Sequence, residues 1–115
     1  MIEFSFWQTL ADLAIASRVI IDRPKGSVHP RYPDLAFPFD YGYLEGTSSA
    51  DGGGVDVWLG SLASRELAGI LCTYDSGKRD AEIKLVIGAT DDDIESILRF
   101  NARFMHFIFL PRPQE

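Results

Sequence analysis

The sequence predicts one α+β domain, mainly β: a small β-barrel with an N-terminal and a C-terminal helix packed outside it. Short apolar segments rich in β-branched residues alternate with glycine-containing turns, as in barrels and sandwiches. Two further stretches show the apolar spacing of helices. A chain of 115 residues can bury one modest core but not two, so we expect a single domain over residues 1–115.

Composition limits the classes of partner. A hydrophobic content of 46% with 24% charged residues is typical of a globular protein rather than a disordered one. The net charge of −6 argues against nucleic acid, because no basic surplus is present to release counterions. A small anion remains compatible with this charge, provided that a divalent metal reverses the local field.

The single cysteine and the N-terminal sequence predict a cytoplasmic protein. Cys72 lies in an apolar segment, where we expect it to be buried in the core, and a lone cysteine builds no disulfide framework. Glu3 and Asp12 interrupt the first apolar stretch, and no basic segment precedes it, so we predict no signal peptide. No apolar run approaches the length that spans a membrane, and we expect no membrane partner.

The first elements are a helix and a strand. The helix is predicted from Ser5 to about Ala16, with Ser5 as its N-cap, and we expect it to cover a sheet. Its apolar residues at helical spacing are Phe6, Leu10, Leu13 and Ala14. A strand follows over residues 19–21 and stops at Arg23-Pro24, since proline removes a backbone donor.

Residues 25–40 predict an ordered, functional loop, because prolines at 24, 30, 33 and 38 exclude a helix and disfavour a strand. Aromatic residues run through and just beyond this loop: Tyr32, Phe37, Phe39, Tyr41 and Tyr43. Such density usually indicates the wall of a small core. The functional alternative is a phenol directed into a polar site, for which Tyr41 is the best candidate.

The segment from Asp51 to Trp58 contains two aspartates separated by three glycines and one valine. The glycines allow positive φ and a tight turn, so Asp51 and Asp56 can converge. Alternation places Asp56 and Trp58 on one face of a strand and the apolar residues 55, 57 and 59 on the other. Converging carboxylates suit a hard cation such as Mg²⁺. An acidic surface hairpin explains the same pattern, since Asp-Gly is also a turn signal.

A hairpin is predicted next, with strands over residues 69–75 and 80–87 around the turn 76–79. On the second strand, alternation places three polar residues on one face: Asp80, Glu82 and Lys84. This face is either exposed to solvent, as in many antiparallel sheets, or part of a site.

The last elements are a helix and an apolar segment. Thr90 is the expected N-cap of a helix that runs to about Met105, and the acids at 91–93 favour its N-terminal dipole end. Residues 106–110 predict a strand in this sheet or in that of a neighbouring copy, and we expect a homo-oligomer. Neither His29 nor His106 has the sequence neighbours expected of a zinc ligand or a catalytic-triad base.

Three segments, taken in order, resemble the soluble inorganic pyrophosphatase family (family I type), in a short and divergent form. They are Asp22-Arg-Pro-Lys-Gly-Ser27, Phe37-Pro-Phe-Asp-Tyr-Gly-Tyr43 and Asp51-Gly-Gly-Gly-Val-Asp-Val57. Thr47 precedes the third segment, and the later stretch 82–86 resembles the family's Asp-x-Lys-Leu-Val. The resemblance spans roughly residues 18–110 and implies an OB-like barrel.

The resemblance also implies roles for individual residues. Asp51 and Asp56 match metal-binding aspartates, Glu82 stands where an aspartate ligand is found, and Asp22 stands where a glutamate lines the metal site. Lys84 and Tyr41 match phosphate-site residues, and Lys25 and Arg31 are nearby cations without a one-to-one match. Asp51, Asp56, Lys84 and Tyr41 are therefore the expected catalytic residues. The implied cofactor is Mg²⁺, with Mn²⁺ as a substitute.

The departures from the family bear on the rate. Gly53 replaces the middle aspartate, which helps to orient and deprotonate the attacking water, and Phe37 and Asp40 replace a tyrosine and an asparagine. The family's C-terminal Tyr-Lys pair has no clear equivalent, and a hairpin between the early motifs is missing. We therefore expect Mg²⁺-dependent, attenuated hydrolysis of inorganic pyrophosphate. The alternatives are a non-catalytic metal- and phosphate-binding relative, and a structural barrel that only forms oligomers.

Overall fold

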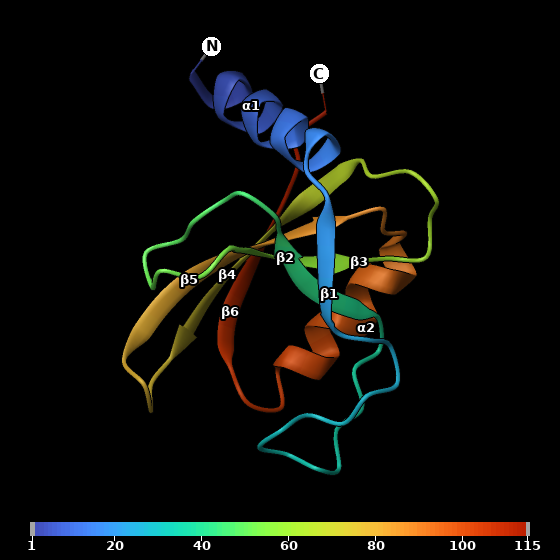
Figure 1. The fold of residues 1–115 in the computed structure, drawn as a ribbon, viewed down its shortest axis with the longest axis vertical. Helices are drawn as coiled ribbons and strands as arrows, with labels where there is room; N and C mark the ends of the chain where they lie inside the picture. The colour runs from blue at the N-terminus through green and yellow to red at the C-terminus, as the bar shows by residue number, and fades with distance from the viewer. Residues whose placement is uncertain (1, 115) are drawn as a thin grey trace.

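The computed structural model describes residues 2–114 and contains one sheet and two helices (Figure 1). In chain order, the elements are α1 Ile2–Ala16, β1 Val19–Arg23, β2 Asp40–Leu44, β3 Val55–Leu59, β4 Leu67–Asp75, β5 Asp80–Ile87, α2 Asp91–Asn101 and β6 His106–Pro111. The predicted α+β, mainly β class is confirmed. In the described part of the chain, neither helix is long and apolar enough to cross a membrane.

The sheet has six strands in the order β1-β2-β3-β5-β4-β6. Neighbouring strands are antiparallel except β3 and β5, which run parallel. Strands β1 and β6 are the two ends of this order, and within residues 2–114 they do not pair with each other. The sheet is therefore not closed, and the predicted barrel is not confirmed.

The two faces of the sheet carry separate apolar cores, as the alternation along β3 and β5 requires. On one face, Val57 and Leu85 pack with the buried alanines of α1. On the other face, Trp58 and Val86 pack with Ile97 of α2. The polar side chains of β3 and β5 that share the face of Trp58 therefore lie on the α2 side of the sheet.

Helix α1 covers the sheet as predicted, but its register and first residues differ. Ser5 lies inside the helix and is not its N-cap. The packed positions are Trp7, Leu10, Ala11 and Ala14. They follow i, i+3, i+4, i+7 spacing, so the sheet contacts a stripe shifted from the predicted one, which leaves Phe6 and Leu13 exposed. The alanines allow the helix backbone to approach the sheet closely.

The hairpin and the C-terminal segment confirm the predicted strands. Strands β4 and β5 pair from Asp75 opposite Asp80 to Leu67 opposite Ile87. The apolar tail forms β6 and pairs along β4 in the protein's own sheet, with Ile108 and Leu110 still exposed. Cys72 is half-buried at the edge of the α1-side core, not fully buried as predicted.

Helix α2 begins as predicted and ends earlier, at Asn101 rather than Met105. The Thr90 hydroxyl accepts a hydrogen bond from the Asp93 N–H, and the Asp93 carboxylate accepts one from the Thr90 N–H, which forms a capping box. The same carboxylate also accepts hydrogen bonds from the N–H and hydroxyl of Ser61, at 2.8 and 2.7 Å. Asp93 therefore links the helix start to the segment after β3.

Replacing Asp93 with Asn should make stability less dependent on pH. Burial alone would raise the pKa of Asp93, but the hydrogen bonds from Ser61 and Thr90 outweigh it and lower the pKa to about 2. A lowered pKa stabilises the fold above the unfolded-state value near 4 and loses that contribution as the pH falls toward 2. We expect Asp93→Asn to cost about 1 kcal/mol at pH 7, on the scale of a lost helix cap, and the difference from wild type to vanish near pH 2.

Urea unfolding followed by circular dichroism at pH 7, 4 and 2.5 measures this difference. Asp92→Asn is the matched control, because Asp92 is an exposed acid in the same helical turn. An equal loss in Asp92→Asn, or a gap in Asp93→Asn that persists at low pH, would contradict the assignment.

Candidate functional site

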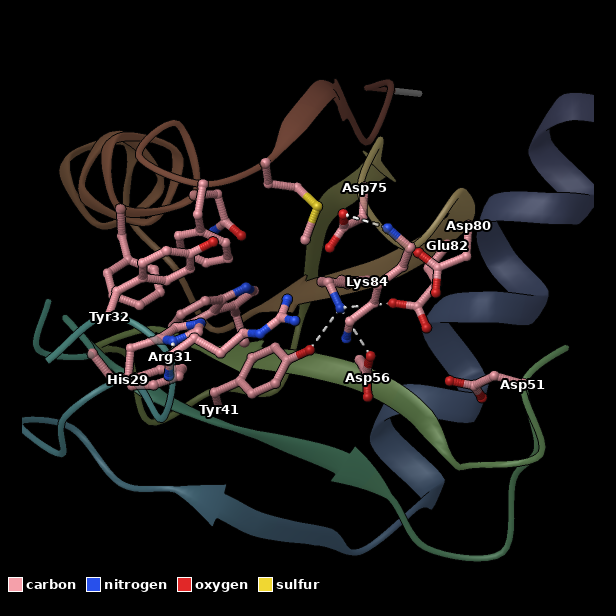
Figure 2. A pocket seen from close by; sticks show the side chains of 17 residues that line it. His29, Arg31, Tyr32, Tyr41, Asp51, Asp56, Asp75, Asp80, Glu82 and Lys84 are labelled. Atoms are coloured by element: carbon pink, nitrogen blue, oxygen red, sulfur yellow. Dashed lines mark hydrogen bonds and ion pairs between the residues drawn. The ribbon is translucent and has the colours of Figure 1, made fainter.

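The centre of the site is the ammonium group of Lys84, on the α2 side of the sheet (Figure 2). Its Nζ lies 2.9 Å from Asp56 Oδ2, 3.2 Å from Glu82 Oε2 and 2.7 Å from the Tyr41 hydroxyl oxygen. Asp56 is the direct neighbour of Lys84 across the parallel β3–β5 pair. Glu82 precedes Lys84 by two residues and therefore projects from the same face. Three strands thus bring four polar groups to one point.

The charge states of this cluster are fixed at neutral pH. Burial raises the pKa of the Tyr41 hydroxyl above its ordinary value, so the group stays a neutral phenol. Burial opposes the charge of Lys84, but Tyr41 and Asp56 outweigh burial and raise the pKa of the amine. Lys84, which is 6% exposed, therefore carries a permanent positive charge in a poorly solvated position. Such a charge can hold an anion and cannot act as a general base at neutral pH.

The glycine loop places Asp51 beside this cluster. Gly52 adopts φ +89°, which only glycine takes readily, and the loop closes through a 2.7 Å hydrogen bond from the Ser49 N–H to the Gly53 carbonyl. The Asp51 carboxylate accepts hydrogen bonds from the Ser49 hydroxyl and the Gly53 N–H. These two donors, with a smaller contribution from Glu82, lower the pKa of Asp51 to about 2. Asp51 is therefore ionised and held by its own loop.

These side chains line one cavity of about 300 Å³ between the sheet, α2 and the proline-rich loop. The predicted residues that the structure brings to this cavity are Arg31, Tyr41, Asp51, Asp56, Glu82 and Lys84. Asp51 and Asp56, whose carboxylates were expected to converge, both line this cavity. Their roles in metal and phosphate binding stay predictions.

The proline-rich loop is ordered by its own hydrogen bonds. An antiparallel bridge joins Val28 to Ala36, and backbone hydrogen bonds of 2.8 Å run from Gly26 to Phe37 and from Phe37 to Ser27. This hairpin-like loop carries Arg31 to the cavity, where Figure 2 shows its side chain extending toward the end occupied by Tyr41 and Lys84. The loop is thus part of the site wall.

Two predicted site residues lie elsewhere. Asp22 is exposed on the terminal strand β1 and does not line the cavity. The Lys25 ammonium lies 5.1 Å from the centre of the Phe39 ring, and the Lys25 N–H donates to the Asp40 carboxylate, also outside the cavity. The family resemblance assigned both residues to the site of Asp51 and Asp56. In the sheet, however, β2 lies between β1 and β3, the strand that carries Asp56.

Several cavity residues were not predicted as site residues: His29, Tyr32, Lys78, Asp80, Asn101 and Phe104. Alternation along β5 already placed Asp80 with Glu82 and Lys84, so that signal was available. Asp75, which the family resemblance matches loosely to a further metal-binding aspartate, also lines the cavity, and its carboxylate accepts hydrogen bonds from the N–H groups of Gly77 and Lys78 at 2.9 and 3.0 Å. The loop 25–40 was predicted to be functional, but no sequence signal singled out His29 or Tyr32 within it, or Asn101 and Phe104, because long-range packing brings these residues together.

The oxygen ligands of this site suit Mg²⁺ that is also bound by water and phosphate, but not Mg²⁺ bound by protein side chains alone. Within residues 2–114, no three His, Cys, Asp or Glu side chains are grouped so as to hold a metal ion, so an all-protein cage is absent. Mg²⁺ usually keeps several waters and binds through one or two carboxylates plus substrate phosphates. Asp51, Asp56 and Glu82 supply oxygen ligands of that kind, and two of them already share the charge of Lys84.

A second hollow of about 600 Å³ adjoins the first and shares four acidic wall residues with it: Asp51, Asp56, Asp80 and Glu82. Its other walls are more apolar and include Val55, Cys72 and Ile83. The acidic residues therefore form a ridge between a mixed polar and aromatic cavity and an apolar one.

No protein-family model matches this chain, and no curated protein matches it in sequence.

Proposed function

We propose that this protein hydrolyses inorganic pyrophosphate with Mg²⁺, at an attenuated rate, as a short and divergent relative of the soluble inorganic pyrophosphatases. The main support is the position of Lys84. Its permanently charged ammonium lies on a cavity wall between Asp56 and Glu82, in hydrogen-bond contact with Tyr41. A buried cation among carboxylates is an arrangement suited to a phosphate group that arrives with a divalent metal.

The residues of this chain would divide the work as follows. Lys84 and Arg31 hold phosphate oxygens and offset the charge that grows on the leaving oxygen. The neutral Tyr41 phenol donates a hydrogen bond to the same group. Asp51, Asp56 and Glu82 hold Mg²⁺, which lowers the pKa of a water and neutralises phosphate charge when bound. Positioning of the substrate supplies a further share of the rate.

A specific observation favours a second candidate, a metal- and phosphate-binding protein without turnover. The loop between Asp51 and Asp56 contains only glycine and valine, so no carboxylate stands there to accept the proton of the attacking water. Losing a positioned general base costs about a hundredfold or more in rate. The ligand-binding residues are unaffected by this loss.

We extend the proposal to the architecture. The strand order β1-β2-β3-β5-β4, with its parallel β3–β5 pair, is the order expected of a five-stranded OB-like barrel that is opened at one seam. In this interpretation β6 has taken the place beside β4 where a closing strand would pair.

Release of orthophosphate from pyrophosphate, with Mg²⁺ and with a chelator, tests the proposal directly. We expect Mg²⁺-dependent release by the wild-type protein and at least a tenfold loss in Asp56→Asn. Ten times the dissociation constant of Mg²⁺ should stabilise the wild type by about 1.4 kcal/mol, a rise in Tm of roughly 5–10 °C, since the ion binds the native state. Asp56→Asn should lose most of that rise, measured against its own metal-free Tm.

Asp22→Asn is the control, because it removes an equal charge from a carboxylate outside the cavity. It should keep both the metal response and the turnover. A metal response unchanged in Asp56→Asn would end the metal assignment, whereas a normal metal response without phosphate release would favour the non-catalytic candidate.

A further inference from the structure

The cavity has an aromatic end as well as a polar one. Figure 2 shows His29 and Tyr32 at the end of the cavity away from Asp56 and Glu82. The rings of His29 and Phe104 are half-buried, that of Tyr32 is exposed, and His29 and Phe104 pack against buried rings of the α2-side core. The centre of the His29 ring lies 4.6 Å from that of Phe104 and 4.9 Å from that of Tyr32. Burial, with a smaller effect of nearby arginines and a lysine, lowers the pKa of His29, so its ring is neutral at neutral pH. This end offers flat, uncharged surfaces.

Tyr41 joins the two ends. Its hydroxyl contacts Lys84, while its ring centre lies 4.7 Å from that of Trp58 and 5.9 Å from that of Phe37. A ligand that places a phosphate at Lys84 therefore has the aromatic surfaces within the same cavity.

One buried donor on this wall lacks a partner within residues 2–114, and a neighbouring buried side chain has an oxygen without a hydrogen bond there. Trp58 is 1% exposed, and its Nε1–H is a buried side-chain donor without a hydrogen bond in residues 2–114. Asn101 is 2% exposed, and its Nδ2 donates to the Ile97 carbonyl at 2.8 Å, while no hydrogen bond to its Oδ1 is found in the described chain. Both residues line the cavity. Leaving a buried donor unpaired is unfavourable, so an unpaired donor on a residue of the cavity wall favours a ligand that carries an acceptor.

Inorganic pyrophosphate has no atom suited to this end. It carries no flat surface to stack on the rings, and its charge would be poorly solvated beside them. A planar nitrogen heterocycle matches this end of the cavity. Its face can stack on the aromatic side chains, and its edge carries acceptors and donors for the unpaired polar atoms of Trp58 and Asn101.

We propose, resting on the proposed function of this site, that the preferred substrate is an organic diphosphate bearing a planar nitrogen heterocycle, of the nucleoside diphosphate class. The diphosphate lies at Lys84 and Arg31, and the heterocycle stacks on Tyr32, with Trp58 donating to a ring nitrogen and Asn101 accepting from an amino group. The cavity volume of about 300 Å³ is at the lower end of the range of small-molecule sites and suits one base with its diphosphate partly in solvent.

The reaction is a simple hydrolysis. The oxygen of a water forms a bond to the terminal phosphorus, and the bond from that phosphorus to the bridging oxygen breaks. The bridging oxygen stays on the nucleoside monophosphate, and the protons of the water pass to orthophosphate and to solvent. No oxidant, reductant or second substrate is required.

Isothermal titration calorimetry with three probes tests the proposal: adenosine diphosphate, methyl diphosphate and inorganic pyrophosphate. Methyl diphosphate has the charge of adenosine diphosphate without the ring. We expect adenosine diphosphate to bind about tenfold or more tightly than methyl diphosphate, the scale of one base stacked on an aromatic side chain.

Three variants test which residues cause the preference for adenosine diphosphate over methyl diphosphate. Tyr32→Ala and Trp58→Phe should each reduce this affinity ratio at least threefold and leave the affinity for methyl diphosphate unchanged. Tyr74→Ala is the matched control, since Tyr74 is 45% exposed outside both cavities and Tyr32 is 40% exposed. Because Tyr32 is so exposed, Tyr32→Ala should stay folded even if Trp58→Phe does not.

Each outcome decides a separate point. Equal affinities for the three probes, with no effect of Tyr32→Ala, would overturn the inference and leave phosphate binding standing. Tight binding of adenosine diphosphate, with no binding of methyl diphosphate or pyrophosphate, would overturn the diphosphate assignment and, with it, the proposed function. Loss of the adenosine diphosphate preference in Tyr32→Ala but not in Tyr74→Ala would support the proposal.

Discussion

Replacing Lys84 with Met should lower kcat/KM for pyrophosphate by about a hundredfold to a thousandfold, the scale of removing one preorganised charge-stabilising donor. Its ammonium is buried on the cavity wall, so solvent screens it little, and an anion at the site feels most of its charge. Affinity for orthophosphate, which requires no chemistry, should fall in parallel. Steady-state kinetics and calorimetric titration with orthophosphate measure the two effects.

The same change affects stability, which has to be separated from activity. Without Lys84, the carboxylates of Asp56 and Glu82 face each other with no counter-ion. Both are partly exposed, so we expect a cost of about 2 kcal/mol rather than the larger cost of breaking a fully buried pair. The double variant Glu82→Gln/Lys84→Met removes that repulsion. It should recover most of the stability and none of the phosphate affinity.

Lys25→Met is the control for net charge, because the Lys25 ammonium lies over the Phe39 ring and not in the cavity. It should leave turnover and orthophosphate affinity within twofold of wild type. If a folded Lys84→Met protein kept the wild-type affinity for orthophosphate, phosphate would have to bind elsewhere, and the assignment of the phosphate site to this cavity would be wrong.

Local pattern predicted most of the secondary structure correctly. The alternation in Val55–Leu59 and Asp80–Ile87 correctly placed Asp56 on the face of Trp58 and Glu82 on the face of Lys84, because strand side chains alternate whatever the sheet is joined to. The sequence did not show that this face also carries an apolar core. The capping residue Thr90 located the start of α2, since a cap needs only nearby backbone groups. The end of α2 and the N-cap of α1 were wrong.

Sheet closure could not be predicted from the same patterns. Alternation says which side chains share a face, but not which strand pairs with the two ends of the sheet. Strand β6 occupies the free side of β4, and β1 remains at the other end, so the barrel expected from the sequence is not closed. The face of α1 was misjudged for a related reason. Trp7 and Ala11 were selected by the position of the helix over the sheet, not by its own composition.

The candidate site was predicted in part. Residues on β2, β3 and β5 lie together because each projects from the α2 side of the sheet and the strands are neighbours. Asp22 and Lys25 were assigned by motif order alone, and the structure keeps them away from the cavity. The aromatic end could not be foreseen. It forms where the proline-rich loop meets α2 and the turn that follows it, through contacts of His29 with Phe100 and Phe104.

Gly53 is the position where one side chain should increase turnover. It stands in the loop between Asp51 and Asp56, where the family that the sequence resembles has an aspartate. Its φ is not positive, unlike that of Gly52, so an L-residue is not strained there. An added Cβ would meet only the Asp51 carboxylate oxygen, at 3.4 Å, which is an ordinary contact. The Gly53→Asp protein should therefore fold, and its new carboxylate would lie beside Asp51 at the cavity rim.

We expect Gly53→Asp to raise kcat for pyrophosphate by about tenfold or more, the scale of general-base catalysis reduced for imperfect placement. The control is Gly53→Asn, which has nearly the same shape but cannot accept a proton at neutral pH, and it should show no gain. Gly52→Asp adds the same charge one residue earlier, but φ +89° at that position would strain the loop. A folded Gly53→Asp protein that keeps its Mg²⁺ response and gains no rate would show that the missing base does not limit turnover. The non-catalytic candidate would then be favoured, because every residue proposed to bind phosphate would be present without producing hydrolysis.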